Sequence, residues 1–184
     1  MNDTSTDFLD IDGAAGEGGG QVLRTSLALS LISGRPFTLR NIRGGRSKPG
    51  LQRQHLTCVE AARVVGDATV DGATPGSSFL RFVPGAIRHG DHRFAIGTAG
   101  STSLVVQTIL WPLLHAEGHS TVIVEGGTHV PMAPTTTFLT TAFIPALARF
   151  GLQDHVDVDL DAHGFFPAGG GRVIVELRGG VAPG

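Results

Sequence analysis

A glycine-rich loop near the N-terminus combines residue types that bind phosphate groups. Residues 15–24 (AGEGGGQVLR) run from an expected strand into an expected helix. Loops of this kind bring backbone amides close to an anion at the positive end of the helix. Glu17 places a carboxylate among the glycines, where a divalent ion that bridges phosphates could be held. The loop matches neither a Walker motif nor a dinucleotide fingerprint, and a plain tight turn explains it equally well when it is considered alone.

A second candidate anion site follows in residues 42–55 (IRGGRSKPGLQRQH). Arg43 and Arg46 flank two glycines, so both guanidinium groups can project from a turn, and Gln54 lies at the start of the next helix. Seven of the 14 basic residues lie between positions 24 and 53, and six of these seven are arginines, whose planar fork matches phosphate oxygens. A phosphate clamp and a solvated basic turn both remain open.

A third segment, residues 94–108 (FAIGTAGSTSLVVQT), repeats the arrangement of a glycine-containing loop that opens a helix. Gln107 lies further along that helix. We expect Ser101 or Thr102 to cap the helix, and capping is a sufficient explanation of the loop if no ligand is bound.

Two later loops carry histidines. Residues 126–135 (GGTHVPMAPT) open the last helix, and we interpret His129 as a surface residue in preference to a ligand. Residues 163–173 (HGFFPAGGGRV) indicate a turn before a strand, with glycines that serve backbone geometry and a structural role for His163.

The sequence consists of two similar units in tandem, and equivalent positions in the two units are 84 to 85 residues apart. Each copy predicts strand, helix, strand, helix and two strands, and the copies span about residues 8–84 and 92–178. The last helix is expected as one run over residues 135–150. Each helix is expected to end at a glycine in the left-handed conformation, at equivalent positions in the two copies: Gly34, Gly66, Gly118 and Gly151. The fold class is therefore α/β (α+β), with tandem βαβαββ units that share one core in a single domain.

Composition excludes several classes of protein. The 184 residues are 41% hydrophobic and 16% charged, which favours an ordered globular chain. No apolar run approaches a membrane span, and the polar first residues do not resemble a signal peptide, so we expect a cytoplasmic protein with no membrane partner. A net charge of -2 argues against a protein that coats nucleic acid. The single cysteine, Cys58, predicts a buried and unreactive thiol.

Five strings in the same order resemble the RNA 3'-terminal phosphate cyclase family along essentially the whole chain. They are DGAAGEGGGQVLRTSLALS, FTLRNIRGGRSKPGLQRQHLT, FAIGTAGSTSLVVQT, GGTHVPMAP and HGFFPAGGG. The resemblance implies helices packed on small four-stranded mixed sheets. It also implies an enzyme that uses ATP to convert an RNA 3'-terminal phosphate into a 2',3'-cyclic phosphate through adenylylated intermediates.

The resemblance also implies roles for individual residues, ATP and a Mg or Mn ion as cofactors, and RNA with a 3'-phosphate end as partner. Glu17 would lie beside the metal and the nucleotide phosphates. Gln21 would lie beside the residues that bind the RNA phosphate or the triphosphate. Gln107 and Pro134 would lie along the adenylate pocket. The residues expected to bind the RNA phosphate or the triphosphate are Arg24, Arg43, Arg46 and Gln54.

The chain lacks several features of the family pattern. The family has a third copy of the unit, an inserted smaller domain and a nucleophilic histidine near its C-terminus, and none of the eight histidines here matches that motif. The adenine-pocket tyrosine is also missing, because the chain contains no tyrosine. We therefore expect the chain to carry only part of an active site and to be inactive on its own. We also expect it to associate with a missing C-terminal segment or with a second copy of itself.

Two other functions are open at this point. An enolpyruvyl transferase relative would share the repeated units and the arginine-lined phosphate sites. A non-catalytic cyclase-like protein could bind RNA or act in ribosome assembly. The phosphate-binding residues argue against the second, and the missing histidine argues for it.

Overall fold

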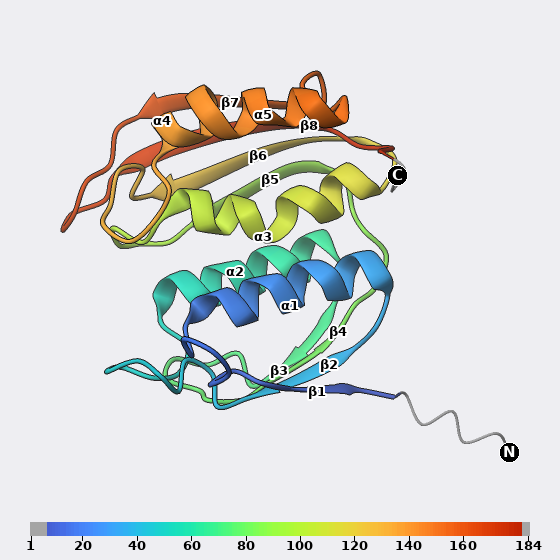
Figure 1. Ribbon diagram of the computed structural model, residues 1–184, viewed down its shortest axis with the longest axis vertical. Helices are drawn as coiled ribbons and strands as arrows, with labels where there is room; N and C mark the ends of the chain where they lie inside the picture. The colour runs from blue at the N-terminus through green and yellow to red at the C-terminus, as the bar shows by residue number, and fades with distance from the viewer. Residues whose placement is uncertain (1–6, 182–184) are drawn as a thin grey trace, which may run out of the picture.

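The first repeat forms a four-stranded sheet with two helices on one face (Figure 1). The computed structural model describes residues 7–181. The first and second strands of the sheet pair in parallel and the remaining pairs are antiparallel, in the order β1-β2-β4-β3. The elements are β1 (Leu9–Asp12), α1 (Gly20–Ser33), β2 (Phe37–Arg40), α2 (Arg53–Val65), β3 (Thr69–Asp71) and β4 (Leu80–Val83).

The second repeat has the same topology, with the strand order β5-β6-β8-β7 and the same alternation of parallel and antiparallel pairs. The predicted βαβαββ order and the two small mixed sheets are confirmed. The strands and the first helix are β5 (Gly90–Ala95), α3 (Thr102–His115), β6 (His119–Gly126), β7 (Val156–Ala162) and β8 (Gly171–Arg178). The second helical segment of the repeat lies between β6 and β7.

This second helical segment differs from the single helix predicted over residues 135–150. It consists of α4 (Thr136–Phe138), a π-helical turn (Leu139–Phe143), α5 (Ile144–Leu147) and a 3₁₀ turn (Ala148–Phe150). Pro145 has no N–H to donate to the carbonyl four residues earlier, and a π-helical turn directly precedes it, in which the Ile144 N–H bonds to the Leu139 carbonyl.

The two repeats meet through α1 and α2 of the first and α3 of the second (Figure 1). The first sheet lies on the far side of α1 and α2, and the helical segment 136–150 lies away from the first repeat. Helix α3 packs against both α1 and α2 on one side and against its own sheet on the other.

Cys58 on α2 is fully buried at the contact between α2 and α3, with its Sγ 3.7 Å from the Leu104 carbonyl oxygen. Burial raises the pKa of the Cys58 thiol to about 11. The prediction of a buried cysteine is confirmed, and its lack of reactivity stays a prediction. No helix within residues 7–181 has the length and apolarity to cross a membrane.

The prediction that all four equivalent glycines end helices in the left-handed conformation is only half right. Gly34 and Gly151 have φ of 70° and close their helical segments as expected. Gly66 has φ of -96°, and helix α3 ends at His115, before Gly118. Packing explains Gly66, because a Cβ there would collide with Leu31 of α1. A Cβ on Gly118 would collide in the same way with the ring of His89.

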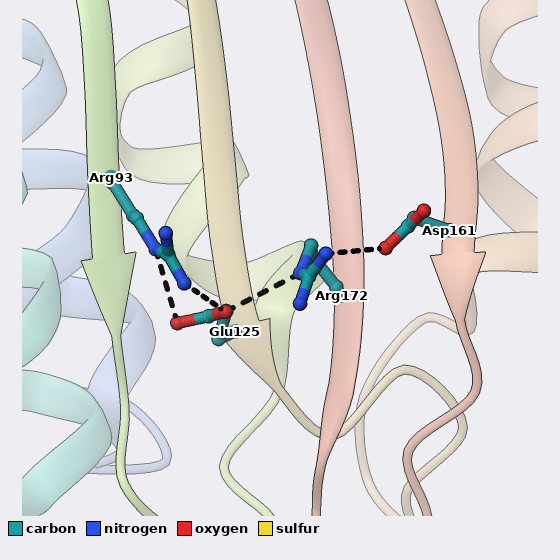
Figure 2. Close-up of polar contacts among 4 residues, drawn as sticks. All are labelled: Arg93, Glu125, Asp161 and Arg172. Carbon is teal, nitrogen blue, oxygen red and sulfur yellow. Dashed lines mark hydrogen bonds and ion pairs between the residues drawn. The ribbon is translucent and has the colours of Figure 1, made fainter.

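A row of alternating charges crosses the outer face of the second sheet (Figure 2). Glu125 on β6 accepts from Arg93 on β5 at 2.7 Å and from Arg172 on β8 at 3.3 Å. Arg172 also donates to Asp161 at 2.9 Å, near the end of β7. The hydrogen bond from Arg93 lowers the pKa of Glu125, with the charge of Arg172 adding to the effect. All four strands are thereby joined by side chains as well as by their backbones.

A capping box at the start of α2 fixes the position and the tautomer of His55. The Gln52 backbone N–H donates to His55 Nδ1 at 3.3 Å, while the Gln52 side chain accepts from the backbone at His55. The His55 side chain is buried. Burial, followed by the charges of Arg43 and Arg24, lowers the pKa of His55 to about 4. His55 is therefore neutral in the folded protein at neutral pH, with its proton on Nε2.

We predict that His55 makes the protein less stable as the pH falls from about 6.5 to about 4. In this range the unfolded chain binds a proton at this histidine and the folded chain does not, so each step down in pH favours unfolding. His55→Asn keeps an acceptor for the Gln52 N–H and removes the titration. Between pH 7.5 and pH 4.5 the unmodified chain should lose roughly 2 kcal/mol more than the variant, as measured by urea unfolding.

His115→Asn, at an exposed histidine at the end of α3, is the matched control and should follow the unmodified chain. Equal loss of stability in the His55→Asn variant and the unmodified chain would contradict the prediction.

Candidate phosphate-binding site

A cavity of about 920 Å³ opens where the loops before α1, α2 and α3 come together with residues 130–133 and Phe166. It brings together six of the eight predicted site residues, although they come from two separate segments of the sequence. These six are Glu17, Gln21, Arg24, Arg43, Arg46 and Gln54.

Arg24 carries a buried charge that no side chain neutralises. It projects from the second turn of α1 and is 7% exposed. Its Nη2 donates to Gln21 Oε1 at 2.8 Å, while its Nε is buried without a hydrogen-bond partner, and it forms no ion pair within residues 7–181. Burial lowers the pKa of Arg24, which remains a cation because arginine does not deprotonate in proteins. An anion in the cavity would offset the cost of this burial.

The first turn of α1 is open toward the same cavity. Gly19 is the N-cap residue and offers no side chain to the backbone N–H groups, and no acidic residue lies in the first turn. Gly18, Gly19 and Gly20 all line the cavity. A Cβ on Gly19 would lie 2.7 Å from Arg46 Nη2, and a Cβ on Gly20 would lie 2.9 Å from Arg24 Nη1. The glycines therefore allow two arginines to approach the end of the helix, which a plain turn would not require.

Arg43 is held in place by backbone carbonyls. Its Nη1 donates to the carbonyl oxygens of Lys48 and of Gly50, the latter at 2.9 Å, and these bonds close the loop that leads into α2. Burial and the neighbouring charge of Arg46 lower the pKa of Arg43. Neutral carbonyls orient the guanidinium without cancelling its charge, so the cavity keeps a second cation.

Arg46 and Glu17 bind each other across the mouth of the cavity. Arg46 Nη2 lies 3.3 Å from Glu17 Oε2, and the two side chains are 42% and 93% exposed. An exposed pair of this kind contributes at most about 1 kcal/mol, so both groups are available to a ligand at little cost.

Glu17 is the one carboxylate among the residues that line this cavity. No cluster of three or more metal-binding side chains occurs within residues 7–181. A single carboxylate fits a Mg²⁺ ion that takes its other ligands from water and substrate phosphates.

Gln54 joins the two repeats at the cavity wall. Its Oε1 accepts from the Ser101 backbone N–H at 2.6 Å, at the start of α3. The expectation that the Ser101 or Thr102 side chain caps α3 is wrong, because both hydroxyls are used elsewhere. Ser101 Oγ bonds to Ser103 Oγ at 2.7 Å, and Thr102 Oγ1 donates to the Gly127 carbonyl at 3.1 Å. Periodicity within one helix could not reveal that Gln54, from another helix, takes the N–H of the cap residue.

Gln107 and Pro134 do not line the main cavity. They lie at a separate, largely apolar cavity of about 170 Å³ between α3 and the helical segment 136–150. Leu104 lines both cavities, and Ser103 Oγ donates to the Pro134 carbonyl oxygen at 2.6 Å. Their assignment to an adenylate pocket stays a prediction.

Sequence reasoning did not include His55 among the site residues, although it also lines the main cavity. Its position directly after Gln54 in the sequence was the signal that could have indicated a place in the site.

His129 is half-buried, and both ring nitrogens bond to hydroxyls, Nδ1 to Thr128 Oγ1 and Nε2 to Thr137 Oγ1, each at 2.9 Å.

Comparison with known proteins agrees with these features. Residues 15–183 match the family model for RNA 3'-terminal phosphate cyclase. An RNA 3'-terminal phosphate cyclase from Ralstonia nicotianae is 57% identical over 169 residues, which cover 92% of this chain and 48% of the relative. One from Ectopseudomonas mendocina is 54% identical over 171 residues, which cover 93% of this chain and 49% of the relative. The chain spans about half the length of the curated relatives it matches, and it belongs to the RNA 3'-terminal phosphate cyclase family.

Proposed function

We propose that this chain supplies the phosphate-binding part of an enzyme that uses ATP to close a 2',3'-cyclic phosphate on RNA. The observation that carries the proposal is Arg24, a buried guanidinium without a counter-ion at the open N-terminus of α1. The names of the relatives supply the reaction class. We place the activity in the cytoplasm, with ATP and an RNA 3'-phosphate as substrates.

The proposed chemistry transfers AMP from ATP to the RNA 3'-phosphate through adenylylated intermediates, with release of pyrophosphate. The 2'-hydroxyl then attacks the phosphorus of the 3'-phosphate, and AMP leaves. Both steps concentrate negative charge on phosphate oxygens, and catalysis of this kind consists largely of positioning and charge neutralisation. In our proposal Arg24 and the amides of α1 hold one phosphate at the bottom of the cavity. Arg43 and Arg46 contact oxygens nearer its mouth, and Glu17 would hold a divalent ion, which would supply positive charge beside the nucleotide phosphates.

His55 is unsuited to the role of nucleophile in this scheme. Its Nδ1 lone pair accepts from the Gln52 N–H, so Nε2 carries the proton and has no lone pair with which to attack phosphorus. We propose instead that the neutral His55 ring packs beside Arg24 and lines the cavity without adding a further positive charge.

Neither alternative raised from the sequence is favoured by these observations. The family match does not favour an enolpyruvyl transferase relative. A scaffold without catalytic function has no use for a buried cation that lacks a counter-ion.

We predict that Arg24→Met weakens anion binding at least tenfold without destabilising the fold. Methionine fills a similar volume and removes a desolvated charge, so the free energy of unfolding should stay the same or rise by about 1 to 4 kcal/mol. The affinity for inorganic tripolyphosphate should fall at least tenfold, because about 1.5 to 3 kcal/mol is lost with each hydrogen bond to a charged group. Urea unfolding and titration calorimetry on the same preparations measure the two effects.

Arg63→Met is the matched control, because Arg63 lies on the exposed side of α2 in an ion pair with Glu60. It should bind tripolyphosphate as the unmodified chain does. An Arg24→Met chain that binds tripolyphosphate normally would refute the assignment of Arg24.

We predict that Glu17→Gln removes the effect of magnesium on ATP binding. In the unmodified chain Mg²⁺ should strengthen binding, since the Glu17 carboxylate and the phosphates can share the ion. The glutamine variant should lose this gain. Without magnesium it should bind ATP as tightly as the unmodified chain or up to about fivefold more tightly, because Arg46 is released from a surface ion pair.

Titration calorimetry with ATP, with and without MgCl₂, measures both effects. Glu60→Gln, in an exposed pair on α2, is the control. A full magnesium effect in the Glu17→Gln variant would exclude Glu17 as the metal ligand.

A further inference from the structure

Large apolar side chains gather at one rim of the phosphate cavity. Phe166 is 72% exposed and Met132 is 94% exposed, and both line the cavity that contains the three arginines. Phe165, directly before Phe166, is 55% exposed and does not line the cavity. Single exposed apolar residues are common on protein surfaces. Here two of them border a strongly cationic cavity, and a third lies next to them in the chain.

The adjacent phenylalanines have different surroundings. The rings of His129, His163 and Phe165 form a stacked cluster: His129 and His163 have centroids 5.4 Å apart, and His163 and Phe165 have centroids 6.0 Å apart with an interplanar angle of 11°. His129 also lies 5.6 Å from Phe165, between ring centroids. Phe165 is thus engaged by the histidine rings, while Phe166 is left facing the cavity.

The loop that carries both phenylalanines is tied to the loop after β6. The Gly164 N–H donates to Thr128 Oγ1 and the Thr128 N–H donates to the Gly164 carbonyl, both at 2.9 Å. The Gly169 N–H donates to the Phe165 carbonyl at 2.7 Å and closes the loop on itself. The position of Phe166 is therefore set by the surrounding structure, so a ligand would not have to order this loop on binding.

An aromatic face beside a group of arginines is the arrangement that binds single-stranded RNA. The arginines hold phosphates, and bases stack on the aromatic side chain with little preference for sequence, because each base has a π-face. A phosphate bound at Arg24 is attached to a ribose and a base. That base has to leave the cavity through its mouth, where Phe166 and Met132 lie.

We propose that Phe166, with Met132 beside it, is the platform on which the base of the RNA 3'-terminal nucleotide stacks, and that the cluster of His129, His163 and Phe165 supports the loop behind it. The proposal rests on the proposed function, because it requires the RNA 3'-phosphate to occupy the arginine cavity. The platform would select single-stranded ends and tolerate all four bases. Its occupant is the RNA base and not the adenine of ATP.

The test is the affinity of the chain for a labelled five-nucleotide RNA that ends in a 3'-phosphate, measured by fluorescence anisotropy. Loss of a stacked base costs about 1 to 3 kcal/mol, so Phe166→Ala should weaken binding roughly five- to 150-fold. Phe166→Trp should retain most of the affinity. Binding of inorganic tripolyphosphate and of ATP should be unchanged in both variants. Phe150→Ala, at an exposed phenylalanine outside the cavity, is the matched control.

A second ligand makes the result independent of any variant. The same RNA with an abasic 3'-terminal nucleotide should bind the unmodified chain about as weakly as the intact RNA binds Phe166→Ala. Equal affinity for the abasic and intact RNA, or an unchanged affinity of Phe166→Ala for the intact RNA, would overturn the stacking proposal. A loss confined to ATP would assign the platform to adenine and would also overturn it.

The proposed function fails separately. If the unmodified chain binds RNA with a 3'-hydroxyl end as tightly as RNA with a 3'-phosphate end, the arginine cavity does not hold the terminal phosphate. Both proposals then fall. A clear preference for the 3'-phosphate together with a normal Phe166→Ala variant removes stacking alone.

Discussion

The charge of Arg24 is the constraint on which the rest of the site depends. A guanidinium that is 7% exposed and has no carboxylate partner costs on the order of several kcal/mol to desolvate. Each neighbour limits that cost without cancelling the charge. Gln21 supplies a neutral acceptor, and Gly20 leaves room for the guanidinium. His55 is kept neutral by its burial and by the charges of Arg43 and Arg24. A carboxylate in any of these places would stabilise the fold and would compete with a phosphate for the arginine.

The two repeats contribute different residues to the cavity. Both repeats place a loop and a helix N-terminus at the cavity, but the first repeat supplies all three arginines that line it. The second repeat supplies the wall, through Ser101 at the start of α3 and the loop that contains Met132. The hydrogen bond from the Ser101 N–H to Gln54 Oε1 joins the two contributions. Because α3 also packs on α1 and α2, a change in how the repeats pack would alter the position of the site.

Six of the eight predicted site residues lie at one cavity, but their functional roles came from the family resemblance and stay predictions. Local sequence patterns were sufficient for the topology, because strands, helices and glycine-rich loops follow from short-range periodicity and turn chemistry. They were insufficient wherever a distant contact decides the outcome. Gly66 ends α2 as predicted, yet its backbone is not left-handed, and a Cβ there would collide with Leu31 on another helix. Gln54 resembles a ligand-binding residue, yet its oxygen takes the N–H of Ser101, 47 residues away. The neutral state of His55 depends on burial and on two arginines that lie outside its own helix.

The two ion-binding elements of the cavity therefore differ in what they contribute. The pair between Arg46 and Glu17 lies in water, where forming or exchanging it changes the free energy by at most about 1 kcal/mol, so it can rearrange around each ligand that enters. Arg24 cannot rearrange, because its neighbours in α1 and α2 enclose it. A phosphate that reaches it gains a charge-assisted hydrogen bond in a partly desolvated environment, where such bonds are stronger than at the surface. In our proposal, affinity for phosphate is therefore concentrated at the buried arginine, and the exposed pair responds to whether a metal ion accompanies the phosphate.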